Sequence, residues 1–180
     1  LLHTYRNKFA KFDILCSQVL LEASIFHDDK RLNHAKDAME VMLEHNIVPI
    51  INENDVTATE ELVFGDNDQL SAYVTHYFDA DILVILTDID GFYDKNPHQF
   101  ADAKLQKIVY KIDEKQLEEK HSANNEFATG GIVTKLKAAE FLMNNGKNMF
   151  LTSGFDLTCA KDYLINEQHI NGTLFKPEGK

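Results

Sequence analysis

Three stretches of the chain place apolar residues at helical spacing, and each is followed by a short run that is mostly apolar. A spacing of three and four residues predicts a helix, whereas an unbroken apolar run predicts a strand buried on both faces. Helices that alternate with such strands predict an α/β fold with a mainly parallel sheet. The predicted pairs of helix and strand are 32–43 with 47–51, 66–77 with 82–86, and 136–143 with 149–152.

The strands also predict where a ligand would bind. In open parallel sheets, ligands lie beyond the carboxyl ends of the strands. The segments 52–55, 87–91 and 152–154 are therefore candidate site loops. Pro49 cannot donate a hydrogen bond to a neighbouring strand, so the strand at 47–51 is expected at an edge or at a bend.

Composition narrows the class of protein. The 180 residues are 44% hydrophobic and 26% charged, which is typical of one globular domain with a core. A net charge of −11 argues against a nucleic-acid or anionic-membrane surface. Cys16 and Cys159 are far apart and suggest neither a disulfide framework nor a zinc site. Because there is no membrane-length apolar run, we expect a soluble, cytoplasmic protein.

One motif has the composition of a phosphate-binding loop. A double glycine stands at the start of the third predicted helix, and a lysine follows one turn later. Backbone N–H groups, the positive end of the helix dipole and the lysine charge would all attract an anion. The motif is not a Walker A loop, and a flexible hinge is the alternative interpretation. Its residues are Thr129, Gly130, Gly131, Ile132, Val133, Thr134 and Lys135.

Two polar segments carry carboxylates and carboxamides. Residues 52–55 follow a predicted strand and residues 65–68 precede a predicted helix. Turn formation and helix capping explain either segment taken alone. Together they suggest a pocket in which carboxylates bind an ammonium group and amides orient a carboxylate, which describes an amino-acid substrate. We therefore assign substrate binding to Asn52, Asn54, Asp55, Asp66 and Asn67.

The segment 87–93 leaves the most apolar predicted strand at its carboxyl end. Thr87 and Asp88 there can form hydrogen bonds with a ligand, while Asp90 and Gly91 favour a tight turn. A plain exit from the strand is the alternative.

These motifs resemble, in sequence and in order, those of the glutamate 5-kinases (gamma-glutamyl kinases), a branch of the amino acid kinase family. The resemblance extends from 47–55 through 65–68, 87–93 and 129–136 to 172–175. It implies a three-layer α/β sandwich with a mainly parallel sheet. It also implies ATP-dependent phosphorylation of the γ-carboxylate of glutamate, the first step of proline biosynthesis.

The resemblance carries specific roles onto this chain. Asp55 and Asn67 are implied to contact glutamate, Asp68 to organise active-site lysines, and Thr87, Asp88 and residues 129–135 to contact ATP. Lys135 and Asp68 are the catalytic candidates. Magnesium is expected to arrive with ATP, so no metal ligands are assigned to the protein. A homo-oligomer and proline as a candidate feedback inhibitor complete the expected partners.

The chain departs from the family pattern at its start. The Lys-x-Gly strand and the Ser-Gly turn of the family have no counterpart here, so 1–175 is expected to be a kinase domain without its N-terminal strands, followed by a polar tail at 176–180. Two alternatives stay open: a kinase of another small carboxylate, and a non-catalytic nucleotide-binding regulatory module.

Overall fold

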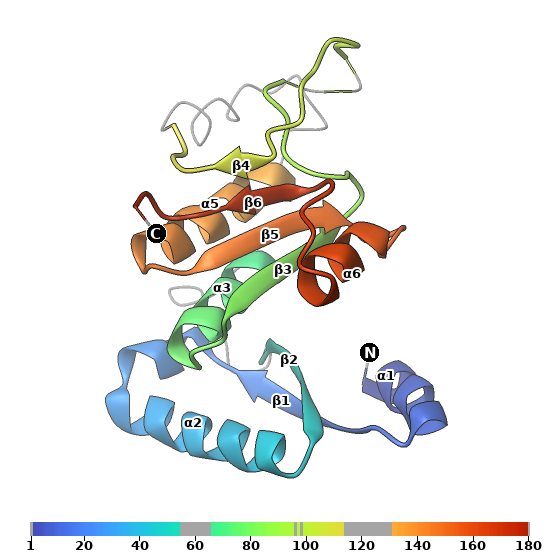
Figure 1. Ribbon diagram of the computed structural model, residues 1–180. Coiled ribbons are helices and arrows are strands. Elements are labelled where there is room, and N and C mark those ends of the chain that lie inside the picture. Colours follow the sequence, from blue (N-terminus) through green and yellow to red (C-terminus); the bar gives the residue numbers. More distant parts are fainter. Residues whose placement is uncertain (1, 55–65, 96, 98, 114–130, 180) are drawn as a thin grey trace. The chain divides into compact units, whose positions relative to one another are not determined.

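The computed structural model describes residues 2–54, 66–95, 97, 99–113 and 131–179 (Figure 1). Two compact units divide the chain, Leu1–Tyr73 and Val74–Lys180. Each unit is described by itself. In the described ranges, no helix has both the length and the apolar character needed to cross a membrane.

The first unit contains a two-stranded parallel sheet whose strands are joined by a long helix. The register runs from Leu15 opposite Ile47 to Leu21 opposite Glu53. Among the described strands, β2 pairs on one side only, which agrees with the edge position predicted from Pro49. The elements are α1 (Leu2–Phe9), η1 (Ala10–Phe12), β1 (Leu15–Leu21), η2 (Ala23–His27), α2 (Asp29–Glu44), β2 (Ile47–Glu53) and the start of α3 (Asn67–Tyr77).

Helix α2 confirms the first predicted helix and shows why it begins where it does. The Asp28 carboxylate accepts hydrogen bonds from the backbone N–H groups of Lys30 and Arg31, both at 3.0 Å. These bonds satisfy two of the donors that every helix start leaves unpaired. Leu32 and Met39 are buried on the apolar face. Past the last turn, Asn46 adopts a left-handed conformation with φ of 55° and turns the chain into β2.

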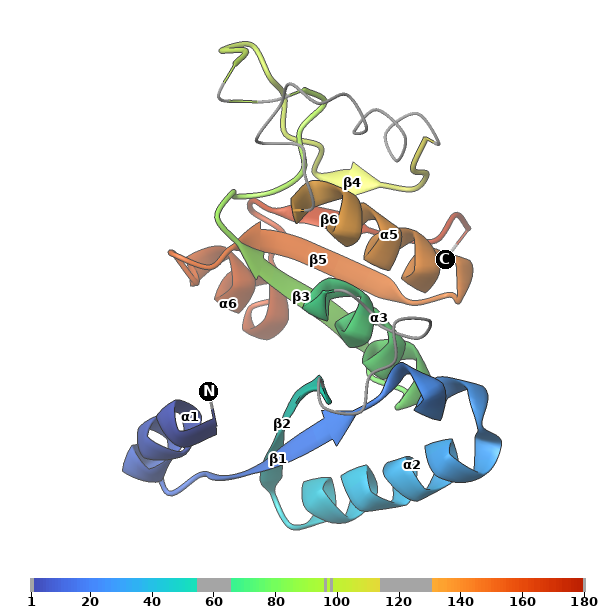
Figure 2. The ribbon, with the colours of Figure 1, turned by 180° about the vertical axis from the view of Figure 1, so that it is seen from behind.

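The second unit has a four-stranded sheet in the order β3-β5-β6-β4. The pairs β3–β5 and β4–β6 are parallel, whereas β5–β6 is antiparallel. Figures 1 and 2 show α5 on one face of this sheet and α6 on the other, so the unit has three layers. Its elements are the end of α3, β3 (Ile82–Thr87), β4 (Ile108–Val109), α5 (Gly131–Asn144), β5 (Asn148–Ser153), α6 (Thr158–Ile165) and β6 (Thr173–Phe175).

The core of this unit lies around β5. Met149, Phe150 and Leu151 are fully shielded from solvent, as is Leu142 of α5. The prediction that the strand at 82–86 is buried on both faces was only partly right, because Leu86 is 51% exposed. The physical reason is that β3 is an outer strand of the four-stranded sheet.

The amino ends of β3 and β5 are tied by a polar contact. Lys147 Nζ lies 2.5 Å from the carboxylate of Asp79 and 3.0 Å from the carbonyl oxygen of Ala80. Gly146, with φ of 73°, ends α5, and the N–H of Lys147 reaches back to the carbonyl of Leu142 at 2.9 Å. The predicted helix at 136–143 is confirmed, and it ends at Asn144.

Candidate functional site

The predicted substrate residues of β2 lie at its carboxyl end. Asn52 belongs to the paired part of the strand, and the N–H of Asn54 continues the ladder by donating to the carbonyl of Leu21 at 2.8 Å. Both asparagines are half-buried, while the intervening Glu53 is only 9% exposed. Carboxamides fixed at a strand end can donate to a carboxylate and accept from an ammonium group. Asp55 lies outside the described residues.

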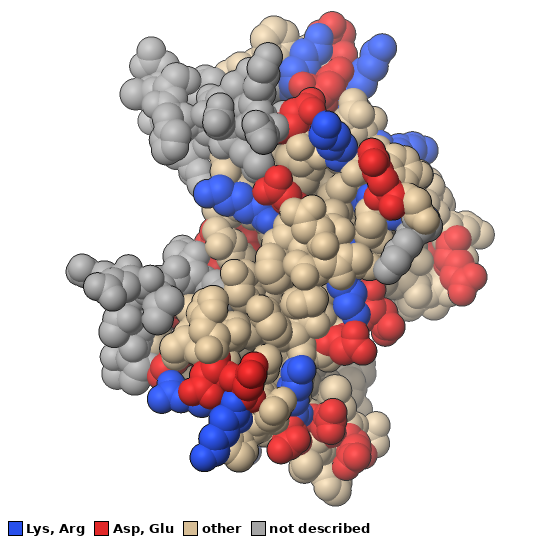
Figure 3. Space-filling view, turned by 90° about the vertical axis from the view of Figure 1, so that its left-hand side faces the viewer, with Lys and Arg blue, Asp and Glu red and all other residues tan. Residues whose placement is uncertain are grey.

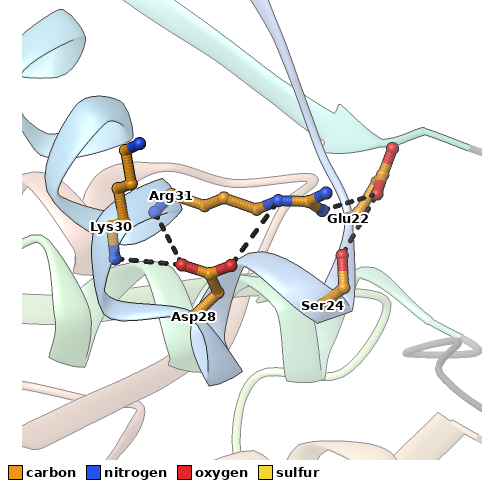
Figure 4. Close-up of polar contacts among 5 residues, drawn as sticks. All are labelled: Glu22, Ser24, Asp28, Lys30 and Arg31. Carbon is orange, nitrogen blue, oxygen red and sulfur yellow. Dashed lines mark hydrogen bonds and ion pairs between the residues drawn. The ribbon is translucent and has the colours of Figure 1, made fainter.

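A carboxylate that the sequence did not point to lies beside these residues. Glu22 directly follows β1, whose last residue Leu21 is paired with Glu53. Its side chain accepts a hydrogen bond from Ser24 Oγ at 3.1 Å and lies 4.0 Å from the Arg31 guanidinium (Figure 4). The apolar residues of 15–21 could have indicated strand β1, but the polar residues among them interrupt the apolar run.

Asp66 and Asp68 lie at the start of α3. Asp66 Oδ1 accepts a hydrogen bond from the N–H of Gln69 at 2.9 Å, so Asp66 caps the helix. Asp68 is half-buried in the first turn, where a negative charge is favourable for the helix dipole. Its backbone carbonyl accepts from Ser71 Oγ at 2.7 Å. Asn67 is exposed and free to face solvent or a ligand at the surface of this turn.

In the second unit, Thr87 is the last residue of β3 and Asp88 directly follows it, so both stand at the carboxyl end of the strand as predicted. Thr87 Oγ1 donates to the carboxylate of Asp88 at 3.0 Å. The N–H of Gly154, just past β5, donates to the Thr87 carbonyl at 2.7 Å. Thr87 is half-buried and Asp88 is exposed. The carboxyl ends of β3 and β5 thus form one polar edge that a ligand can reach.

The described part of the glycine-rich motif begins α5. The chain passes from Asn144 at the end of α5 into β5, so the helix runs antiparallel to that strand and its first turn lies toward the carboxyl end of the sheet (Figure 2). A Cβ built at Gly131 would meet no described atom within 4 Å. Lys135 follows one turn later and is half-buried. Thr129 and Gly130 lie outside the described residues.

This helix start has the features of an anion site. The first N–H groups of a helix have no partner within the helix, and the positive end of its dipole faces the same way. The Thr134 hydroxyl donates back to the Gly131 carbonyl at 3.1 Å. Ile132 and Val133 are half-buried between these polar residues. Helix starts of this kind bind phosphate groups in other proteins.

Charge and cavities complete the description of the site. On the face in Figure 3, Lys and Arg side chains lie interspersed with Asp and Glu side chains. Within the described ranges, His, Cys, Asp and Glu side chains form no group of three that could hold a metal ion. A hollow of about 750 Å³ borders residues 110–113 and the C-terminal half of α5, at Glu140, Met143 and Asn144. It lies at the other end of the helix from Gly131 and is not part of the predicted site.

The structure places the predicted residues in two sets. Asn52, Asn54 and residues 66–68 belong to the first unit, whereas Thr87, Asp88 and residues 131–135 belong to the second. Within each unit the predicted residues stand at strand ends or at a helix start. Their roles as catalytic or ligand-binding groups stay predictions.

Comparison with known proteins agrees with the motifs. A model of the amino acid kinase family matches residues 1–153. The chain is 52% identical to a glutamate 5-kinase of Wolinella succinogenes over its whole length and covers 70% of that relative. It is 49% identical to a glutamate 5-kinase of Helicobacter hepaticus, with 98% of this chain and 67% of the relative covered. The chain thus spans about two thirds of the length of these relatives.

Solved structures give the same fold at low identity. An isopentenyl phosphate kinase in a substrate complex superimposes with a TM-score of 0.61 at 18% identity, covering 93% of this chain and 63% of the other. The carbamate kinase from Giardia lamblia bound to AMP-PNP gives a TM-score of 0.61 at 18% identity, with 98% and 67% covered. Family match, relatives and fold agree: this chain belongs to the amino acid kinase family, in which its relatives at about half identity are glutamate 5-kinases.

Proposed function

We propose that the protein carrying this chain transfers the γ-phosphoryl group of ATP to the γ-carboxylate of L-glutamate and releases γ-glutamyl phosphate and ADP. The observation that carries this proposal is the 52% identity to a glutamate 5-kinase over the whole chain. The predicted polar residues also stand at strand ends and helix starts, where such sheets bind ligands. The reaction would be the first step of proline biosynthesis.

The nucleotide would bind at the carboxyl edge of the second unit. Thr87 and Asp88 would contact ATP, and the N-terminal turn of α5 would hold its phosphates. Support comes from the exposed Gly131, where a Cβ would have no described neighbour within 4 Å, and from Lys135 one turn later. A helix start of this kind attracts phosphate through its N–H groups and its dipole. Thr129 and Gly130 would extend the same loop.

Glutamate would bind at the residues assigned in the first unit. The carboxylates of Asp55 and Asp66 would pair with the substrate ammonium group, and the amides of Asn52, Asn54 and Asn67 would orient its carboxylates. The half-buried positions of Asn52 and Asn54 at the carboxyl end of β2 support this assignment, because ligands of such sheets lie beyond the carboxyl ends of the strands. Asp66 would combine substrate binding with its cap on α3.

The chemistry requires positive charge rather than a proton acceptor. A carboxylate oxygen of glutamate attacks the γ-phosphorus, and the bond to the β-γ bridging oxygen breaks as ADP leaves. A glutamate side chain has a pKa of about 4.3, so the attacking group is already ionised near neutral pH and needs no general base. Lys135 would neutralise negative charge on the transferring phosphoryl group, and Asp68 would hold active-site lysines in place.

Magnesium would enter as the complex with ATP and would supply further positive charge at the phosphates. We assign it no residue of this chain. A homo-oligomer, feedback inhibition by proline and a cytoplasmic location also belong to the proposal, since they rest on the resemblance to the glutamate 5-kinases alone.

A coupled ADP-release assay on the full-length gene product tests this function. Glutamate, aspartate and acetylglutamate would be compared as acceptors at saturating ATP. We expect glutamate to be preferred by about 100-fold or more in kcat/KM, a ratio typical of sites built around polar groups of the substrate. A preference for another acceptor would make the protein a different small-carboxylate kinase. Nucleotide binding without ADP release from any acceptor would favour the regulatory module.

A further inference from the structure

The segment that follows β3 is tied to a turn far along the sequence by the side chain of Asp90. Asp90 Oδ1 accepts a hydrogen bond from the Tyr93 hydroxyl at 2.9 Å. Asp90 Oδ2 accepts one from Asn171 Nδ2 at 3.3 Å, across 81 residues of sequence. Both oxygens of this carboxylate are thus engaged by neutral donors within the protein, and Asp90 is half-buried.

A second hydrogen bond and close packing fix the same segment. The N–H of Phe92 donates to Thr173 Oγ1 at 2.7 Å, and Thr173 is completely buried. Gly91 packs closely against the side chains of Leu105 and Thr173, because a Cβ there would lie 2.6 Å from Leu105 Cδ1 and 2.8 Å from Thr173 Oγ1. The path of the backbone after Asp88 is therefore determined by residues that lie outside the segment itself.

The partner turn is itself held firmly. Gly172 has φ of +85°, and its carbonyl oxygen is hydrogen-bonded to His169 Nε2 at 3.1 Å. Because β6 is antiparallel to β5, with Leu151 opposite Thr173, the turn 171–173 lies toward the carboxyl end of β5. This is the same end at which Thr87 and Asp88 leave β3.

We infer that Asp90 and Asn171 are positioning residues for the nucleotide: their hydrogen bond holds the backbone of Thr87 and Asp88 in the geometry that contacts ATP. This inference rests on the proposed function, because it takes Thr87 and Asp88 as nucleotide contacts. Asp90 acts through the chain, because each of its oxygens already accepts a hydrogen bond from the protein. Small displacements of contact groups cost affinity steeply, so a fixed backbone at this point has a functional consequence.

A purely structural role predicts a different result. If the Asp90–Asn171 bond only stabilised the fold, its loss would lower the melting temperature and leave the affinity of the folded protein for nucleotide unchanged. The two roles are separated by measuring nucleotide binding and thermal stability on the same variants. A double-mutant cycle then tests whether the two residues act through each other.

The test uses Asp90→Ala, Asn171→Ala and the double variant of the full-length gene product. Binding of a non-hydrolysable ATP analogue would be measured by calorimetry well below the melting temperature, beside KM values for ATP and glutamate. We expect each single variant to weaken nucleotide binding about three- to tenfold, the usual effect of losing one hydrogen bond. The double variant should be no weaker than the weaker single one, and the KM for glutamate should change less than about twofold, since no contact with it is altered.

Two further variants sharpen the result. Asp90→Asn keeps an acceptor for one of the two donors and should recover part of the affinity. Lys147→Ala removes the contact with Asp79 at the amino ends of the strands, so it should affect stability and leave nucleotide affinity unchanged.

Nucleotide affinity that stays at the wild-type value in Asp90→Ala and Asn171→Ala would overturn the inference, as would fully multiplicative effects in the double variant. A wild-type protein that binds no nucleotide would overturn it as well. A wild-type protein that binds nucleotide but does not phosphorylate glutamate would refute the proposed function alone. The nucleotide affinities of the single and double variants, measured by calorimetry, would still decide the role of Asp90 and Asn171.

Discussion

The N–H of Gly154 donates a 2.7 Å hydrogen bond to the carbonyl oxygen of Thr87, just beyond the last register pair of β3 and β5. This bond continues the parallel ladder past the strands themselves. It fixes the point at which Thr87 and Asp88 leave the sheet, and the two side chains are joined there by the hydrogen bond from Thr87 Oγ1 to the Asp88 carboxylate. In the sequence, Thr87 and Gly154 are separated by α5. This helix brings Lys135 toward the same end of the sheet.

Lys135→Ala is expected to abolish phosphoryl transfer with little loss of stability. The side chain is half-buried at the start of α5, and its charge would be needed where the transition state spreads negative charge over phosphoryl oxygens. We expect turnover to fall by about 100-fold or more. Lys137→Ala is the matched control, because Lys137 is exposed two residues further along the same helix. Steady-state kinetics and a thermal melt of both variants check the prediction.

A Lys135→Ala variant that retained turnover while melting at a much lower temperature would place this lysine in the packing of α5. Equal losses in Lys135→Ala and Lys137→Ala would indicate a general effect of charge near the helix.

Asp66 offers a way to separate capping from substrate binding. Its carboxylate accepts from the N–H of Gln69, so Asp66→Ala should cost about 1 kcal/mol of unfolding free energy through loss of the cap. Asp66→Asn should keep the cap, since Asn serves equally well at a helix start. If Asp66 also pairs with the substrate ammonium group, Asp66→Asn should still raise the KM for glutamate. Urea unfolding and glutamate kinetics of the two variants, compared side by side, decide the matter. An unchanged KM for glutamate in Asp66→Asn would show that Asp66 caps the helix and does not bind the substrate.

The sequence predicts the parts of the fold that carry a strong local pattern. The helix and strand pairs α2 with β2, α3 with β3 and α5 with β5 are confirmed, because their apolar faces must be buried. Asn or Gly also follows the ends of α2 and α5. Strand β1 was not predicted, since Cys16, Ser17 and Gln18 interrupt its apolar run and most of it is exposed or half-buried. The antiparallel β6 has only three residues, too few for a periodic signal.

The candidate site shows the same division. Local chemistry at Thr87, Asp88 and Lys135 is visible in the sequence, because strand ends and helix starts can be read from neighbouring residues. The Asp90–Asn171 contact is not visible, because it joins residues 81 apart and depends on the reversed direction of β6. The assignments to Asp55, Thr129 and Gly130 fall outside the described residues and stay predictions.

Gly172 is expected to be intolerant of a side chain. With φ of +85° it occupies a conformation that is strained for other residues, and a Cβ would lie 2.5 Å from Cζ of the buried Phe150. Gly172→Ala should therefore destabilise the protein by about 2 to 4 kcal/mol, the sum of backbone strain and overpacking. Gly179→Ala is the control for backbone strain, because Gly179 has the same φ and a Cβ there would meet no atom of the described residues within 4 Å. Chemical denaturation of both variants measures the difference, and equal losses would show that contact with Phe150 is unimportant.

The raised pKa of Tyr93 makes the free energy of unfolding depend on pH in the alkaline range. Burial raises the pKa of Tyr93 above its ordinary value of 10.0, and the hydrogen bond to Asp90 with that carboxylate's charge raises it further. A pKa that is raised in the folded state means that the fold binds the phenol proton more tightly than the unfolded chain does. The stabilisation is therefore fully present below about pH 10 and is lost as the pH rises through the folded-state pKa.

We expect Tyr93→Phe to be less stable than wild type by about 1 kcal/mol near pH 8, through loss of the hydrogen bond to Asp90. Its unfolding free energy should then fall less steeply than that of wild type above about pH 10. Burial also raises the pKa of Tyr163, so part of the alkaline decline will remain in the variant. Urea unfolding at a series of alkaline pH values gives both curves, and parallel curves would contradict the assignment to Tyr93.

Asp68→Asn separates the structural and catalytic roles of the α3 start. A purely structural Asp68 would be replaced at a cost of a fraction of a kcal/mol, because Asn near a helix start retains most of the polar contacts. Turnover would then stay within about fivefold of wild type, which is about 1 kcal/mol of barrier. If Asp68 organises active-site lysines, its charge matters chiefly in the transition state. Turnover should then fall by about two orders of magnitude while the KM values for ATP and glutamate change only a few-fold. Kinetics of the full-length gene product beside a thermal melt distinguish the two roles.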